Sequence, residues 1–109
     1  YYIKVNELII LKILKMENLN KKRVAILATN GFEESELREP KKALEEAGAH
    51  VDIVSLESGT IKSWTDGNWG KTYEVDKTLD GVSHSDYNAL MLPGGVINHQ
   101  KIYRYLILN

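Results

Sequence analysis

Two short, almost continuous apolar runs separated by a helical pattern constrain the fold of this chain more than any other feature. The runs are "RVAILAT" (23–29), which ends at Asn30-Gly31, and "HVDIVSL" (50–56). Such runs are typical of strands buried on both faces of a parallel sheet. Between them, apolar residues recur at helical spacing, at Leu37, Ala43, Leu44 and Ala47. Gly48 is a natural helix stop, so the segment predicts a right-handed βαβ unit.

A third apolar run predicts another strand of the same sheet. It lies in "YNALMLPGG" (87–95) and stops at Pro93-Gly94-Gly95. The preceding stretch differs, because short β-prone segments flank "TDGNWG" (65–70) and predict a hairpin or an extended excursion. Three buried strands with one clear helix predict an α/β fold, with a flavodoxin-like, doubly wound and mostly parallel sheet.

The segment "GFEESELREP" (31–40) places four acids next to a proline. Because proline lacks a backbone N–H, the helix either begins near Pro40 or begins near Glu33 and kinks at Pro40. The second alternative is preferred, since it places Glu33, Glu34 and Glu36 in the first turn, where the helix dipole favours acids. We expect three of the four acids to be solvated and Glu36 to face inward.

Two loops mark the candidate site, one carrying Glu36 and the other carrying Gly95. In a flavodoxin-like strand order, 2-1-3-4-5, they leave adjacent strands at the switch point, where open α/β sheets bind ligands. Glycines at the end of a buried strand let a backbone N–H point at an anion or oxyanion, although Gly94-Gly95 also fits an ordinary strand-to-loop turn. This arrangement lets a glutamate face a backbone donor but identifies no nucleophile.

Composition and spacing exclude several other chemistries. The 109 residues carry a formal charge of -1 and no basic stripe, so nucleic acid is not an expected partner. There is no cysteine for a disulfide, a thiolate metal site or a thiol nucleophile. His50, His84 and His99 lack the spacing of metal ligands, so no metal and no cofactor are expected. "GNWGKT" (67–72) lacks the first glycine of a P-loop, and the apolar run 8–14 is too short for a membrane span.

Residues 21–95 closely resemble the start of the ThiJ/PfpI (DJ-one) family, in its branch of PfpI-like general stress proteins and intracellular proteases. The stretch "FEE-x-E" with the downstream proline, and "LPGG", carry the resemblance. It implies a flavodoxin-like sandwich of the class I glutamine amidotransferase-like kind, which usually forms homo-oligomers. It also implies cysteine-dependent peptidase, glyoxalase or protein deglycase activity on small carbonyl or peptide substrates, in the stress response and in the cytoplasm. The family glutamate that contacts the thiol matches Glu36, and the oxyanion N–H matches Gly95.

The chain departs from the family pattern after "LPGG". The resemblance implies a nucleophile elbow further downstream, which is not reached, and Asn98-His99-Gln100 stands where a proline and an acid are expected. We therefore expect a truncated domain, divided into a non-native or flexible extension (1–15), the N-terminal half of a ThiJ/PfpI domain (16–97) and an atypical tail (98–109). Such a chain is expected to be inactive alone. The alternatives are a non-catalytic module for self-association or partner binding, and a nucleotide-binding domain of flavodoxin-like type.

Overall fold

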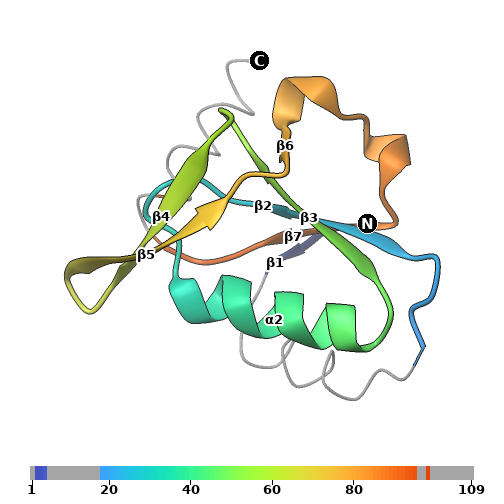
Figure 1. Ribbon diagram of the computed structural model, residues 1–109, viewed down its shortest axis with the longest axis horizontal. Helices are drawn as coiled ribbons and strands as arrows, with labels where there is room; N and C mark the ends of the chain where they lie inside the picture. Colours follow the sequence, from blue (N-terminus) through green and yellow to red (C-terminus); the bar gives the residue numbers. More distant parts are fainter. Residues whose placement is uncertain (1, 5–17, 96–97, 99–109) are drawn as a thin grey trace.

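The computed structural model describes residues 2–4, 18–95 and 98, and Figure 1 shows how their elements are arranged. The elements are β1 (Tyr2–Lys4), β2 (Arg23–Leu27), α2 (Glu34–Glu46), β3 (His50–Ser55), β4 (Thr60–Thr65), β5 (Asn68–Glu74), β6 (Lys77–Thr78), the 3-10 helices η1 (Leu79–Gly81) and η2 (His84–Asp86), and β7 (Ala89–Leu92). The three predicted buried strands and the predicted helix are all present. The expected α/β architecture is thus confirmed.

The main sheet has five strands in the order β1-β7-β2-β3-β6, and every neighbouring pair is parallel. Strand β2 lies between β3 and β7, as the flavodoxin-like order predicts for the first three strands. The chain therefore places β3 on one side of β2 and later crosses back to place β7 on the other side of β2. This reversal places the carboxyl ends of β2 and β7 side by side.

Strand β1 was not expected from the sequence. Its residues Tyr2–Lys4 pair in parallel with Leu90–Leu92 of β7, at the edge of the sheet. Residues 5–15 of the expected extension lie outside the described residues, as does the expected tail except for Asn98. The division into 1–15, 16–97 and 98–109 therefore stays a prediction.

Helix α2 begins next to Glu33 and contains Pro40, so the preferred alternative for the helix start is confirmed. Its buried residues share one face and pack toward the sheet: Leu37, Pro40, Ala43 and Leu44. The helix ends where predicted, because Gly48 takes a φ of 103° and donates its N–H to the carbonyl of Glu45 at 3.0 Å. The helix thus lies along the sheet with its first turn at the carboxyl end of β2.

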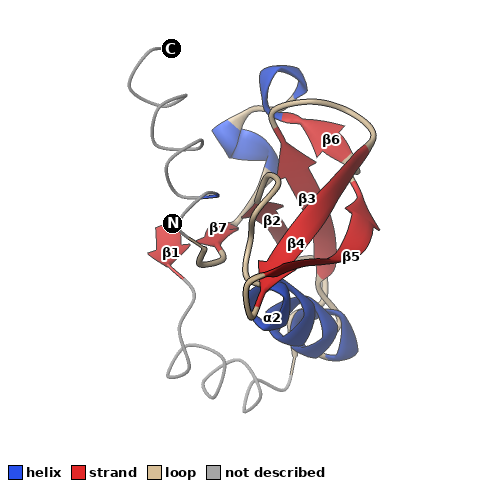
Figure 2. Cartoon of the chain, turned by 90° about the vertical axis from the view of Figure 1, so that its left-hand side faces the viewer, coloured by secondary structure: helices blue, strands red, loops and turns tan. Residues whose placement is uncertain are grey.

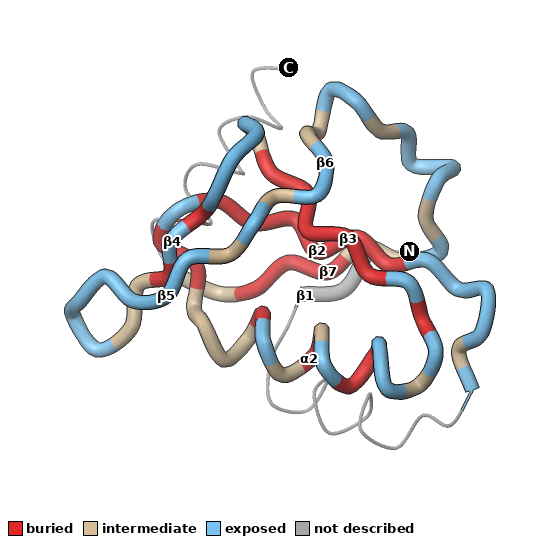
Figure 3. Tube along the Cα trace, viewed as in Figure 1, coloured by how far each residue is buried: buried red, intermediate tan, exposed pale blue. Residues whose placement is uncertain are grey.

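Two apolar layers flank the sheet. The larger cluster lies between the sheet and α2 and is centred on Ile26, Phe32 and Leu37, each fully buried. A smaller cluster, which includes Leu27 and Val54, lies on the opposite face. Figure 2 shows α2 on one side and the short 3-10 helices on the other, and Figure 3 shows burial concentrated along the central strands.

The excursion between β3 and β7 contains the predicted hairpin, formed by β4 and β5. Its turn residues Asp66 and Gly67 have φ angles of 52° and 77°, and positive values at both positions are typical of a type I′ hairpin turn. The P-loop reading of 67–72 is excluded, because this stretch forms the turn and strand β5 and begins no helix. The hairpin also holds the loop after β2, since the Trp64 N–H donates to the Phe32 carbonyl at 2.9 Å.

Candidate active site at the switch point

The loops that follow β2 and β7 meet through Gly94. The Gly94 N–H donates to Oε1 of Glu36 at 2.9 Å, and the Gly94 carbonyl accepts from the Glu33 N–H at 2.8 Å. Glu36, which is half-buried, comes from the first turn of α2, one helical turn before Pro40. The structure therefore places Glu36 beside the loop that follows β7, facing a backbone donor one residue before the predicted Gly95.

Neither glycine of this turn has room for a side chain. A Cβ on Gly94 would stand 2.7 Å from Oε1 of Glu36. Gly95 has a φ of 114°, a conformation that other residues rarely adopt, and a Cβ there would collide with the Gly31 carbonyl. Within the described part of the chain, no acceptor takes the Gly95 N–H. The turn thus presents the Gly94 N–H to Glu36 and holds Gly95 in a conformation that a side chain would not allow.

The other acids of the segment have separate roles. Glu34 is only 14% exposed at its side chain, and it accepts from Arg38 at 2.6 Å and from the Tyr73 hydroxyl at 2.9 Å. The expectation that Glu34 is solvated is therefore wrong, because the hairpin supplies Tyr73 as a hydrogen-bond partner. Burial, followed by the hydrogen bond to Glu34, raises the pKa of Tyr73 to about 12. Glu39 has a 45% exposed side chain that pairs with Arg38, as expected of a charged helix face.

Asn98 ties the two loops together, a role that sequence reasoning missed. Its side chain is fully buried; Oδ1 accepts the Thr29 N–H at 2.6 Å, and Nδ2 donates to the Pro93 carbonyl at 3.1 Å. Thr29 follows β2 and Pro93 follows β7, so one amide joins the two loops. No local sequence pattern indicated this contact, because its partners are distant along the chain.

A second polar network lies at the amino end of β3, at the opposite end of the sheet from Glu36 and Gly94. Asp52 is 5% exposed and accepts from the Tyr87 hydroxyl at 2.8 Å and from Nε2 of His50 at 2.9 Å, while a guanidinium nitrogen of Arg23 lies 3.5 Å away. Burial would raise the pKa of Asp52, but the hydrogen bonds from Tyr87 and His50 outweigh burial and lower it. An aspartate within an apolar strand was a signal that such partners exist.

Of the three histidines, the structure describes His50 and His84. His50 is surface-exposed as predicted, but it is bonded to Asp52. His84 is exposed on η2, and His99 lies outside the described residues. Among the described residues, no three potential ligands gather in a way that could hold a metal ion. No helix in the described ranges is long and apolar enough to cross a membrane.

Comparisons with known proteins relate this geometry to one family. The sequence model of the DJ-1/PfpI family matches residues 22–107. "Putative cysteine protease YraA" of Bacillus subtilis is 43% identical over 74 residues, and general stress protein 18 of the same organism is 39% identical over 74 residues; each match covers 68% of this chain. Deglycase PfpI of Pyrococcus furiosus is 40% identical over 73 residues, which are 67% of this chain.

The matched region is a limited part of these relatives. In all three, the match covers 42% of the relative's own length. A solved structure, the DJ-1 superfamily protein Atu0886 from Agrobacterium tumefaciens, superimposes with a TM-score of 0.59 at 24% identity, covering 69% of this chain and 38% of the other. That likeness supports the fold alone. With the family match over most of its length, the chain belongs to the DJ-1/PfpI family.

Proposed function

We propose that these residues supply the acid and the glycine turn of a cysteine-dependent hydrolase or deglycase that acts on small carbonyl or peptide substrates. The hydrogen bond between Glu36 and the Gly94 N–H is the observation that carries the proposal, because it holds a carboxylate beside the glycine turn. The next N–H of that turn, from Gly95, has no acceptor among the described residues. The relatives' names, which include a cysteine protease, a deglycase and a general stress protein, support this reaction class and a role in the stress response. A homo-oligomer in the cytoplasm, without a cofactor, fits the same proposal.

In the proposed chemistry, each group has one task. A thiolate attacks the substrate carbonyl carbon, and a carbon–sulfur bond forms while the carbonyl electrons move to oxygen. Glu36 takes the thiol proton and returns it to the leaving group as the bond between that group and the carbonyl carbon breaks, and water then hydrolyses the carbon–sulfur bond to free the thiol. The Gly95 N–H donates to the developing oxyanion. The 109 residues contain no cysteine, so the thiol comes from outside them, and these residues alone have no thiol-dependent turnover.

The test restores the thiol and then changes one acid at a time. A chimera joins residues 16–98 of this chain to the part of YraA that follows its matched stretch, and it is assayed for thiol-dependent turnover of methylglyoxal and of a peptide. Glu36→Gln is expected to lower the rate by about 10²–10⁴-fold, the range for a positioned acid–base group. Glu39→Gln is the matched control, since the exposed Glu39 side chain bonds only to Arg38 among the described residues.

Two further outcomes are informative. Glu34→Gln is expected to lower stability more than the rate of the folded enzyme, because Glu34 holds Tyr73 and Arg38. Equal small effects on the rate at Glu34, Glu36 and Glu39 would mean that the segment is only a charged helix start, which would contradict the proposal. A folded chimera without thiol-dependent turnover would favour the alternative, a non-catalytic module for self-association or partner binding.

A further inference from the structure

A polar hollow of about 190 Å³ lies where strands β2 and β3 end. Residues from the loop after β2, from the end of β3 and from the segment that leads into β4 line it: Thr29, Asn30, Ser55, Leu56, Glu57, Ser58, Thr60 and Ile61. The hollow lies on the β3 side of β2, whereas the contact between Glu36 and Gly94 involves the loop after β7, on the other side of β2. It is therefore separate from the candidate active site.

Two buried hydroxyl groups that line this hollow have no hydrogen-bond partner among the described residues. They belong to Ser55, which is 1% exposed, and to Thr29, which is 8% exposed. The Thr29 N–H donates to Asn98, but neither hydroxyl makes a hydrogen bond within the described ranges. Because a buried hydroxyl without a partner costs free energy, these two groups favour a guest that supplies hydrogen bonds.

The rim of the hollow adds one hydrogen-bond donor and one acceptor. Oδ1 of Asn30 accepts the Lys62 N–H at 2.8 Å, which fixes the orientation of the amide and leaves its NH₂ group without an acceptor in the described part of the chain. Glu57 is exposed, and its carboxylate pairs with no described cation. None of the described lining residues is a Lys or an Arg. An anion would thus meet only a like charge, and an ammonium group, which accepts no hydrogen bond, would leave the Asn30 NH₂ unpaired.

Backbone hydrogen bonds hold the walls of the hollow in place. The Ala28 N–H donates to the Val54 carbonyl at 3.0 Å, which keeps the ends of β2 and β3 side by side. The segment before β4 is held as well, since the Gly59 carbonyl accepts the Val75 N–H at 2.9 Å. The hollow is thus preformed, which lowers the ordering cost of binding a ligand.

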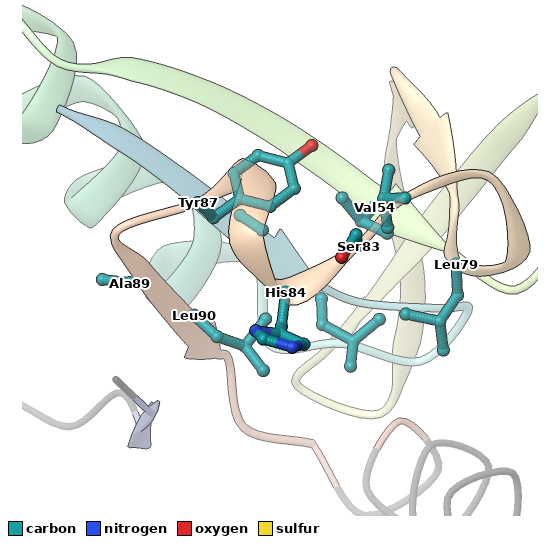
Figure 4. Close-up of a pocket in the computed structure, with 10 residues that line it drawn as sticks. Val54, Leu79, Ser83, His84, Tyr87, Ala89 and Leu90 are labelled. Atoms are coloured by element: carbon teal, nitrogen blue, oxygen red, sulfur yellow. The ribbon is translucent and has the colours of Figure 1, made fainter. Parts of the chain in front are cut away.

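The polar lining is a local property of this end of the sheet. Figure 4 shows a different hollow, of about 260 Å³, in which Val54 and Leu79 are among the aliphatic side chains that face a common space. Side chains alternate along a strand, so Val54 faces that apolar hollow and the next residue, Ser55, faces the polar one. The buried hydroxyls therefore distinguish the polar hollow as a site for a polar ligand.

We propose that the polar hollow binds a small neutral polyhydroxyl compound, between glycerol and a monosaccharide in size. Hydroxyls of the ligand donate to Glu57 and accept from the Asn30 NH₂, and others exchange hydrogen bonds with the Ser55 and Thr29 hydroxyls. Pockets for drug-sized ligands measure about 300–1,000 Å³, so a hollow of about 190 Å³ limits the guest to a smaller molecule. The proposal rests on the hollow alone and stands independently of the reaction proposed above.

The experiment titrates the 109-residue chain with glycerol, ribose and glucose and follows the backbone amides by two-dimensional NMR. We expect at least one of the three compounds to bind in the millimolar range and to shift the amide signals of Thr29 and Ser55. Ser55→Ala and Thr29→Val are each expected to weaken binding by about two- to tenfold, since each removes one hydrogen-bonding hydroxyl. Ser63→Ala is the matched control, because Ser63 is a fully buried serine whose hydroxyl also lacks a partner among the described residues but does not line the hollow.

The amide spectrum of each free variant separates lost binding from lost folding. Glu57→Ala changes an exposed position and is expected to weaken binding by a similar factor, so it tests the proposal even if a buried substitution prevents folding. Weaker binding by the folded hollow variants, with Ser63→Ala unchanged, supports the proposal. Absence of binding by all three compounds would leave water as the guest and would overturn it, as would binding that tolerates every substitution in the hollow. Tighter binding of ethylammonium at the same amides would assign the hollow to a cation and would also overturn it.

Discussion

Asn98 and Thr29 lie 69 positions apart in the sequence, yet the Asn98 side-chain oxygen accepts the Thr29 backbone N–H at 2.6 Å. The same amide donates to the carbonyl of Pro93, so one buried side chain joins the end of β2 to the loop after β7. Those segments lead to Glu36 and to Gly94, respectively. The separation of the acid from its backbone donor therefore depends on Asn98 as well as on the sheet.

Replacing Asn98 with alanine is expected to destabilise the fold. The change removes the acceptor of a buried N–H, which typically costs about 1–3 kcal/mol. Urea denaturation measures the free energy of unfolding, and hydrogen exchange reports the Thr29 amide, which should exchange faster. Asn68→Ala is the control, because the Asn68 side chain is exposed in the hairpin and, among the described residues, makes only a 3.4 Å contact to the Asp66 carbonyl. Equal effects of the two substitutions would show that the Asn98 bridge contributes nothing specific.

The two glycines after β7 are expected to respond differently to alanine. Gly95→Ala should lower stability by at least about 1–3 kcal/mol, the range for a residue held in an unfavourable backbone conformation, and the collision with the Gly31 carbonyl adds to this. Gly94→Ala should cost less, since only the end of the Glu36 side chain must move. Gly59→Ala isolates the conformational part, because Gly59 has a φ of 108° with open space around it. The free energy of unfolding of all three variants is measured by denaturation. The same loss of stability for Gly95→Ala and Gly59→Ala would refute the steric argument.

The elements that could be predicted from the sequence are those set by local patterns. The apolar runs indicated β2, β3 and β7, and the spacing of Leu37 and Leu44 indicated the buried face of α2. The missing N–H of Pro40 left two positions open for the start of the helix; the dipole argument favoured the start near Glu33, and the structure agrees. The flavodoxin-like strand order then predicted that the loops carrying Glu36 and the glycine turn leave adjacent strands.

What could not be predicted depends on contacts between distant residues. Nothing near Glu34 indicated that Tyr73 would cross from the hairpin to bind it. The pairing of β1 with β7 was hidden, because Tyr2–Lys4 has no strand pattern that distinguishes it from the rest of its apolar segment. Asp52 was visible as a charge in a buried strand, but its partners Tyr87 and Arg23 come from elsewhere in the sequence. Side-chain networks of this kind depend on the fold, because they join residues that are distant in the sequence, and no local pattern predicts them.

The buried Asp52 carboxylate should make stability depend on pH. Its pKa is lower in the folded chain than the ordinary value of 3.8, so the folded state favours the ionised form. The resulting stability is fully present above the unfolded pKa and is lost as pH falls below 3.8 through the folded pKa. Asp52→Asn should therefore reduce the free energy of unfolding at pH 7 by about 1.5–3 kcal/mol, the range for hydrogen bonds to a charged group.

The measurement compares wild type and Asp52→Asn by urea denaturation from neutral pH down to acid. The difference between them should shrink as the pH drops below the ordinary carboxyl pKa. Glu57→Gln serves as the control, because Glu57 is exposed and its carboxylate bonds to no other described residue. A difference that stays constant across this range would mean that ionisation of Asp52 does not contribute.

The Tyr73 hydroxyl should lose its proton at a higher pH than a free tyrosine, and its hydrogen bond to Glu34 should stabilise the contact between the hairpin and α2. Burial and the hydrogen bond to Glu34 raise its pKa to about 12, so the linked stability is present below the ordinary value of 10.0 and is lost as pH rises through 12. A stopped-flow pH jump reads tyrosinate absorbance before the chain unfolds, and subtracting the Tyr73→Phe signal isolates this residue. The difference should appear near pH 12 in the folded chain and near 10 in denaturant. Tyr73→Phe should also lower stability at pH 7 by about 1.5–3 kcal/mol. A folded-state midpoint near 10 would show that Glu34 and burial leave the phenol unprotected.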